Sequence, residues 1–262
     1  LARPHRGSLL ALLRLGVPMG LTILIEVTGF AFMAIFIARL GTTAVAGHQV
    51  AANLVSMMFM LPLALSSATS TLVAQCIGAS DLHGARRLGW RGLQLALGLA
   101  LLLGSAVFAG RHGIVALYTN DATVAAAALP LLSWVALFHL GDALQTITQF
   151  VLRAWRITVV TLVVYAISMW GVGLGGGYLI AFGDRALGAA GFWFASTVGL
   201  MLAGVLLTGF LVWMLRRRAD AAQRVRRRVG AGQRHARASV ARLGRARPGR
   251  RTRGARPRRA DL

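Results

Sequence analysis

The sequence is poor in three kinds of reactive or charged residue. Its 262 residues include no lysine, one cysteine and one glutamate, and only seven residues are acidic. A lone cysteine excludes a disulfide framework within the chain and a thiolate metal site, so Cys76 is interpreted as a small packing residue. No nucleophile–base set or metal-ligand cluster is recognisable either, and an enzyme is therefore not predicted.

Apolar residues are abundant instead. They make up 56% of the chain, above the about 45–50% of ordinary soluble domains. They form six runs that are long enough to cross a bilayer, and no run alternates apolar and polar residues as membrane barrels do. The sequence therefore predicts an all-α, polytopic membrane protein with a six-transmembrane-helix bundle. The predicted spans cover residues about 11–38, 44–78, 84–110, 122–152, 157–182 and 187–215.

The basic residues divide the chain into parts. Residues 1–215 hold 11 arginines and 5 acids, whereas residues 216–262 hold 18 arginines and 2 acids. We expect residues 1–9 to be a truncated flank, because the chain starts at leucine, and 10–215 to be the membrane lobe. The segment 216–262 has almost no large apolar residues and is predicted to be a disordered cytoplasmic tail.

The tail has three interpretations. The one we favour is a solvated anchor that stops membrane insertion, followed by low-complexity sequence. Contact with anionic lipid headgroups is an alternative, because juxtamembrane arginines are attracted to them. Nucleic acid is not an expected partner, since the tail has no interleaved aromatic residues on which bases would stack.

The loops predict an orientation. If the N-terminus is cytoplasmic, the inside segments carry eight arginines before the tail and the outside segments carry three. The positive-inside rule then places both termini in the cytoplasm.

Two carboxylates lie inside predicted spans. Glu26 is midway along the first apolar run, and Asp142 is past the middle of the fourth, which runs the opposite way. An ionised carboxylate costs a few kcal/mol at that depth, and those that persist there usually bind ions, carry protons or meet cationic substrates. We expect Glu26 and Asp142 to face one polar cavity and to bind Na⁺ or H⁺. Alternatively, neighbouring polar residues satisfy each carboxylate separately and both serve packing.

Four further side chains are candidates for lining this cavity or ion site. Gln49 and Asn53 share a face of the second span and carry amide oxygens, although hydrogen bonds between helices account for them equally well. Phe138 lies one turn before Asp142 and is suited to a flat cation, whereas His139 is a candidate proton relay. The glycine-rich segment 171–177 lacks the context of a phosphate loop and predicts a close helix contact or a bend.

Several stretches together resemble the MATE (multidrug and toxic compound extrusion) family, in particular its NorM-type bacterial branch. The resemblance covers roughly residues 10–215 and is specific, because it joins a glutamate in the first span, a His-Gln run in the second and an aspartate in the fourth. The stretches are EVTGFAF at 26–32, LGTTAVAGHQVAAN at 40–53, MFMLPLAL at 58–65 and GDALQ at 141–145, with LR at 152–153, WGVGL at 170–174 and GY at 177–178.

The resemblance implies a fold and a function. Family members have twelve helices in two lobes, and this chain resembles only the second lobe, so the partner it implies is a missing N-terminal lobe in the same or a longer polypeptide. The implied activity is export of cationic drugs across the bacterial inner membrane in exchange for Na⁺ or H⁺, with no cofactor. Glu26 and Asp142 match the cation site of that lobe.

The sequence also departs from the family. Some relatives have tyrosine where Phe138 stands, and a proline common in the fifth-helix glycine segment is absent. A second hypothesis is therefore kept beside the antiporter: a non-transporting, truncated membrane protein whose helices only pack.

Overall fold

The computed structural model describes residues 6–183 and 187–245, and every regular element in these ranges is a helix. Six of the helical segments are long and apolar enough to cross a membrane, which confirms the predicted fold class. The elements are α1 (Arg6–Ala38), α2 (Thr42–Gly78), α3 (Leu82–Tyr118), α4 (Ala122–Ala154), α5 (Val159–Ala166), the π-helix η1 (Ile167–Gly176), α6 (Gly177–Phe182) and α7 (Gly188–Arg245).

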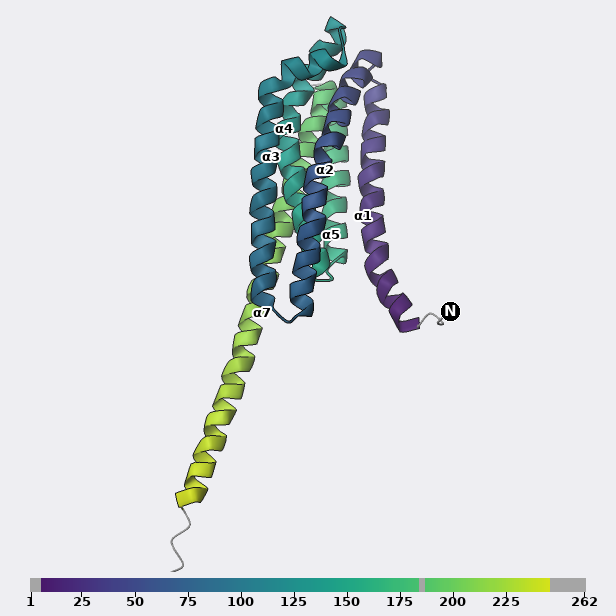
Figure 1. Ribbon diagram of the computed structural model, residues 1–262. Helices are drawn as coiled ribbons and strands as arrows, with labels where there is room; N and C mark the ends of the chain where they lie inside the picture. The colour runs from purple at the N-terminus through teal and green to yellow at the C-terminus, as the bar shows by residue number, and fades with distance from the viewer. Residues whose placement is uncertain (1–5, 184–186, 246–262) are drawn as a thin grey trace, which may run out of the picture. The chain divides into compact units, whose positions relative to one another are not determined.

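The helices up to Trp213 form one compact unit, and the chain from Met214 onward forms a second. Within the first unit, α2, α3 and α4 pack against one another, while α1 contacts α2, α5 and η1. Figure 1 shows α1 at one edge of this bundle. The fifth span is not a single α-helix, because α5, η1 and α6 follow one another without a break.

Short connections force neighbouring helices to run in opposite directions. The turns between the first four helices contain three residues each, at 39–41, 79–81 and 119–121. Two of these turns end in an aspartate that caps the next helix. The Asp81 carboxylate accepts a hydrogen bond from the Gly84 N–H, and Asp121 accepts from the N–H groups of Thr123 and Val124. The hydrogen bonds from Thr123, led by that of its hydroxyl, lower the pKa of Asp121.

The third span is longer than predicted. The sequence places its end near residue 110, before Arg111, but the helix continues to Tyr118. Arg111 does not stop the helix because its guanidinium donates to the Phe108 carbonyl at 2.6 Å and lies over the Phe108 ring. Val115 is then buried in the core, so the last two turns of the helix contribute to packing.

The segment after residue 215 also differs from its prediction. The sequence predicts disorder for 216–262, whereas α7 continues through 216–245 as helix. Arginine and alanine, which dominate this segment, are among the strongest helix formers, and the first proline of the tail is residue 248. Residues 246–262 of the expected tail, residues 1–5 of the flank and the outside loop with Arg185 lie outside the described residues.

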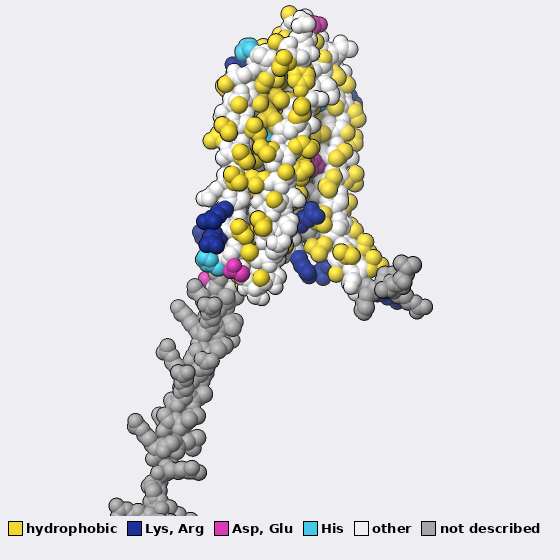
Figure 2. Space-filling model, in the orientation of Figure 1, with side chains coloured by type: hydrophobic (Ala, Val, Ile, Leu, Met, Phe, Trp, Pro, Cys, Tyr) yellow, Lys and Arg dark blue, Asp and Glu magenta, His cyan; other side chains and the backbone are white. Residues whose placement is uncertain are grey.

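Apolar side chains face both inward and outward. The core is built around large buried residues such as Trp193, Phe192 and Phe138. Many leucines and valines are exposed along the spans, and Figure 2 shows hydrophobic side chains over most of the visible bundle. Among the arginine side chains coloured in this view, most lie towards the end that carries the α2–α3 turn. This surface suits a bilayer rather than water.

The glycine-rich segment makes the close helix contact that its composition predicts. A Cβ atom at Gly199 of α7 would lie 2.5 Å from the Ser168 carbonyl oxygen of η1. A Cβ atom at Gly177 would likewise meet the Phe192 ring at 2.7 Å. Glycine is therefore needed where η1 and α6 approach α7.

Substitution of Gly199 by alanine should destabilise the bundle, because the added methyl meets backbone that cannot rotate away. Overpacking of this kind costs about 1–3 kcal/mol. The measurement is the thermal unfolding midpoint of the purified protein in detergent. Gly98→Ala is the matched control, since a Cβ atom at Gly98 meets nothing within 4 Å and alanine favours helix. Equal midpoints for the two variants would contradict the close contact.

Candidate functional site

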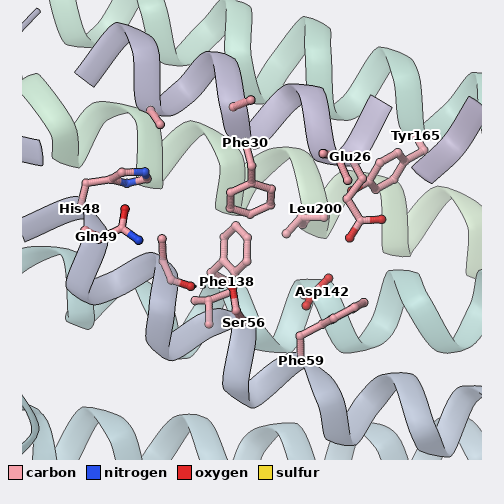
Figure 3. A pocket seen from close by; sticks show the side chains of 15 residues that line it. Glu26, Phe30, His48, Gln49, Ser56, Phe59, Phe138, Asp142, Tyr165 and Leu200 are labelled. Carbon is pink, nitrogen blue, oxygen red and sulfur yellow. Dashed lines mark hydrogen bonds between the residues drawn. The ribbon is translucent and has the colours of Figure 1, made fainter. Parts of the chain in front are cut away.

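A cavity of about 410 Å³ opens in the bundle between α1, α2, α4, α5 and α7. We call it the carboxylate cavity, because the side chains of both Glu26 and Asp142 line it. Figure 3 shows the two acids reaching towards one another from opposite sides of the space. The other residues that line it are Val27, Phe30, Ala31, Ala34, His48, Gln49, Ala52, Val55, Ser56, Phe59, Phe138, Tyr165 and Leu200.

The two acids differ in their access to the surroundings. Asp142 is 6% exposed and lies among buried residues of α4, whereas Glu26 is half-buried on α1 at the bundle edge. The carboxylates are near enough to interact electrostatically, and the Thr146 side chain lies beside Asp142, one turn along α4. The antiparallel run of α1 and α4 brings the acids to one depth, as expected from their places in the two spans. Their role as a cation site stays a prediction.

Tyr165 of α5 is a third polar group at this site. Its side chain is 2% exposed and lines the carboxylate cavity near both Glu26 and Asp142. No hydrogen bond from its hydroxyl is found within residues 6–183 and 187–218. Sequence reasoning missed this tyrosine, since aromatic residues are common in membrane spans and its orientation depends on how α5 packs.

Aromatic rings form one wall of the cavity. Phe138 packs edge-on against Phe30, with centroids 6.0 Å apart, and against Trp193, at 5.3 Å. The Trp193 indole N–H donates to the Nδ1 atom of His48 at 3.3 Å. Because Nδ1 accepts this bond, His48 is a neutral imidazole with its proton on Nε2. Phe138 therefore lines the cavity, as the sequence predicts, and belongs to a stack fixed by Trp193.

The other three predicted lining residues have different outcomes. Gln49 lines the carboxylate cavity. Asn53 is not among the lining residues, and its side-chain oxygen accepts a hydrogen bond from the Tyr118 hydroxyl at 3.1 Å. His139 does not line it either, and its ring is fully buried, with no hydrogen-bond partner for either nitrogen in the described part of the chain. Asn53 is thus bonded to Tyr118 of the next helix and His139 is enclosed in the core, and a role for either residue in the ion site stays a prediction.

The position of α1 beside the cavity is fixed by η1. The Trp170 indole N–H donates to the Ile25 carbonyl at 3.1 Å, one residue before Glu26. A Cβ atom at Gly29 would touch the same indole at 3.7 Å, and the Trp170 ring meets Phe32 edge-on at 5.8 Å. Trp170 therefore holds the turn of α1 that carries Glu26.

The donor set determines which ions fit. Carboxylate, amide and hydroxyl oxygens suit hard cations such as Na⁺ and do not suit soft metals. Among the described residues, no group of three or more histidines, cysteines, aspartates and glutamates is placed to hold a metal ion. The oxygen donors of the cavity are therefore of the kind that hard cations prefer, and the identity of the ion stays a prediction.

The sequence profile of the MatE family matches residues 18–179, more than half of the chain. The chain belongs to the MatE family. This match includes Glu26 and Asp142 and most of the cavity wall, so the family assignment rests on the part of the chain described above.

Curated relatives of this MatE chain are named as multidrug resistance proteins. The probable multidrug resistance protein NorM of Aromatoleum aromaticum is 42% identical over 224 residues, which are 84% of this chain and 48% of the relative. The multidrug resistance protein NorM of Aliivibrio fischeri is 34% identical and covers 82% of this chain and 47% of its own length. The chain therefore spans about half the length of the curated relatives it matches.

Solved structures agree on the fold. A MATE structure in the bent conformation superposes with a TM-score of 0.75 at 18% identity, over 86% of this chain and 48% of that one. The eukaryotic MATE transporter AtDTX14 gives a TM-score of 0.72 at 23% identity, over 76% of this chain and 45% of that one. This MatE chain is a multi-pass membrane protein with the architecture of half of such structures.

Replacing Trp193 by phenylalanine should destabilise the site selectively. The ring against Phe138 is kept, but His48 loses its donor, and a buried group left unpaired costs about 1–3 kcal/mol. The thermal midpoint of unfolding in detergent should fall by more than in Trp134→Phe. Trp134 is the control because it packs edge-on against Phe194, and within the described residues no hydrogen bond is found for its indole. Similar midpoints for both variants would mean that the bond to His48 stabilises nothing.

Proposed function

We propose that this chain forms the cation-coupling half of a multidrug antiporter, which exports organic cations in exchange for Na⁺ or H⁺ through Glu26 and Asp142. The observation that carries the proposal is the meeting of two membrane carboxylates in one cavity of a bundle whose relatives are named multidrug resistance proteins. The bacterial inner membrane is the proposed location, with both termini in the cytoplasm, as the arginine distribution predicts.

Exchange follows from competition for the same negative charge. Two carboxylates in a poorly solvated space are stable when a cation or protons neutralise them, and an empty ionised pair is costly. A coupling ion and a cationic substrate that both bind this negative charge repel one another, so the site does not hold both at once unless another group offsets the repulsion. Binding of the ion therefore favours release of the substrate, and the ion drives the cycle only if it binds one conformation more tightly than the other.

The wall of the cavity suits the substrate. Phe30, Phe59 and Phe138 line the cavity together with the acids, and aromatic faces attract organic cations. Phe138 lacks the hydroxyl that tyrosine provides at this place in some family members. Tyr165 offers a hydroxyl to the same cavity from α5, and we propose that it serves as a further oxygen ligand.

Neutralising either acid should abolish cation-coupled efflux. Glu26→Gln and Asp142→Asn keep the shape of the side chain but remove the charge that an entering ion must balance. The assay is ethidium efflux from loaded cells that express this chain fused behind the first half of the Aromatoleum relative. Both variants should lose at least about tenfold in rate, which corresponds to about 1.4 kcal/mol.

Asp220→Asn is the matched control, because it removes an exposed acid beyond the last span. Membrane expression of each variant is measured in parallel by quantitative blotting. Unchanged efflux in both Glu26→Gln and Asp142→Asn at normal expression would refute coupling in this half and return both acids to a structural role. Absence of efflux in the unsubstituted fusion, with the fusion folded and inserted, would favour the non-transporting alternative.

A further inference from the structure

A second cavity adjoins the carboxylate cavity at Glu26. This inner cavity, of about 310 Å³, lies between α1, α2, α4 and the start of α5. Glu26, Val27 and Phe59 line both cavities. The Glu26 side chain is therefore placed at the boundary, with one space on each side.

The inner cavity has a polar stripe along one helix. Gln145, Thr146, Gln149 and Arg153 of α4 all line it. Their spacing of three and four residues places them on one face, and the stripe runs about 10 Å from Asp142 to Gln149 at the rise of an α-helix. Placing these polar side chains in a membrane helix costs free energy unless they contact water or another polar group.

Hydrogen bonds order this stripe from the carboxylate outward. The Thr146 hydroxyl, beside Asp142, donates to the Gln145 side-chain oxygen at 3.1 Å. The Gln145 amide N–H donates in turn to the Gln149 Oε1 atom. The Gln149 oxygen is thereby held in place, and a carbonyl oxygen with one donor keeps a second lone pair for a ligand.

The far end of the inner cavity is charged. Arg153 is exposed at the last turn of α4, with its guanidinium 5.5 Å from the centre of the Phe150 ring. A guanidinium is ionised at every relevant pH and is stable here only if water reaches it. The cavity thus has a charged end that needs water and ends at Glu26 at the other. Because the guanidinium also repels a cation, passage requires that water screen its charge.

We propose that the inner cavity is the path by which the coupling cation passes between the Glu26–Asp142 pair and the cytoplasm, with Gln149 supplying the oxygen that carries the cation past the middle of the path. The proposal rests on the proposed function and on the orientation that places Arg153 at the cytoplasmic face. Its competitor is a cavity filled by lipid tails, since Met19, Ile23 and Leu63 form an apolar wall.

Water access to Gln149 distinguishes a hydrated ion path from a cavity filled by lipid tails. Gln149→Cys and the control Gln94→Cys are made in a Cys76→Ser background, which removes the only native thiol. Gln94 is an exposed residue of α3 that lines neither cavity. The probe is a small cationic methanethiosulfonate, applied to inverted vesicles and to intact cells. We expect Gln149→Cys to react at least about tenfold faster than the control in inverted vesicles, because thiols react as hydrated thiolates.

A second measurement tests transport through the path. In the fusion used for efflux, Gln149→Leu should lower the maximal rate of ethidium efflux by about tenfold or more, because the cation loses a coordinating oxygen on its path. The KM for ethidium should stay within about twofold, because the substitution leaves the carboxylate cavity unchanged. A change in the maximal rate counts as decisive only if it reaches about tenfold. Gln149→Asn, which keeps an amide oxygen, should recover part of the rate, and Gln94→Leu should have no effect.

Each outcome decides one of the two proposals. Slow labelling of Gln149→Cys from both faces, labelling from the outside alone, or an unchanged rate in Gln149→Leu would overturn the inner path while leaving Glu26 and Asp142 as the cation site. Loss of efflux in Glu26→Gln together with a normal Gln149→Leu rate is the clearest sign of that case. Full efflux in Glu26→Gln would instead refute the proposed function itself.

Discussion

The structure depends on one constraint: holding two carboxylates inside a membrane-spanning bundle costs free energy. An ionised carboxylate away from water needs a partner charge or several hydrogen bonds. Asp142 has Thr146 beside it and Glu26 across the cavity, so its nearest charge has the same sign. If both carboxylates are ionised, the pair needs a cation or protons to balance its charge, and this need is the basis of the proposed cation site.

The rest of the bundle holds this pair in a fixed geometry. Trp170 ties α1 to η1 beside Glu26, and glycines let α7 approach η1 and α4 closely enough to hold the other wall. Phe138 packs edge-on against Trp193 and lines the cavity. η1 is itself unusual, because π-helical turns are rare and are often found at functional sites. Here the irregular segment supplies the tryptophan that fixes the glutamate-bearing helix.

Sequence alone predicted the architecture and the two acids, because both are strong local signals. An apolar run of bilayer length is seldom anything but a membrane span, and a lone Glu26 or Asp142 within one is conspicuous. Other features depend on tertiary contacts that no local pattern contains. Asn53 bonds to Tyr118, which is 65 residues away, and does not line the cavity. Tyr165 reaches the acids only because of the way α5 packs, and α3 runs past Arg111 because that side chain folds back onto Phe108.

The most direct test is a double-mutant cycle on ion displacement by the purified 262-residue chain in detergent. Ethidium is added, and the release of bound ²²Na⁺ or of protons is recorded for the unsubstituted chain, Glu26→Gln, Asp142→Asn and the double variant. If one cation shares both carboxylates, each single variant loses nearly all of the displacement and the double variant loses no more, because residues that act as a unit are not additive. Losses that add up from the two single variants, or displacement that survives in the double variant, would contradict a shared site.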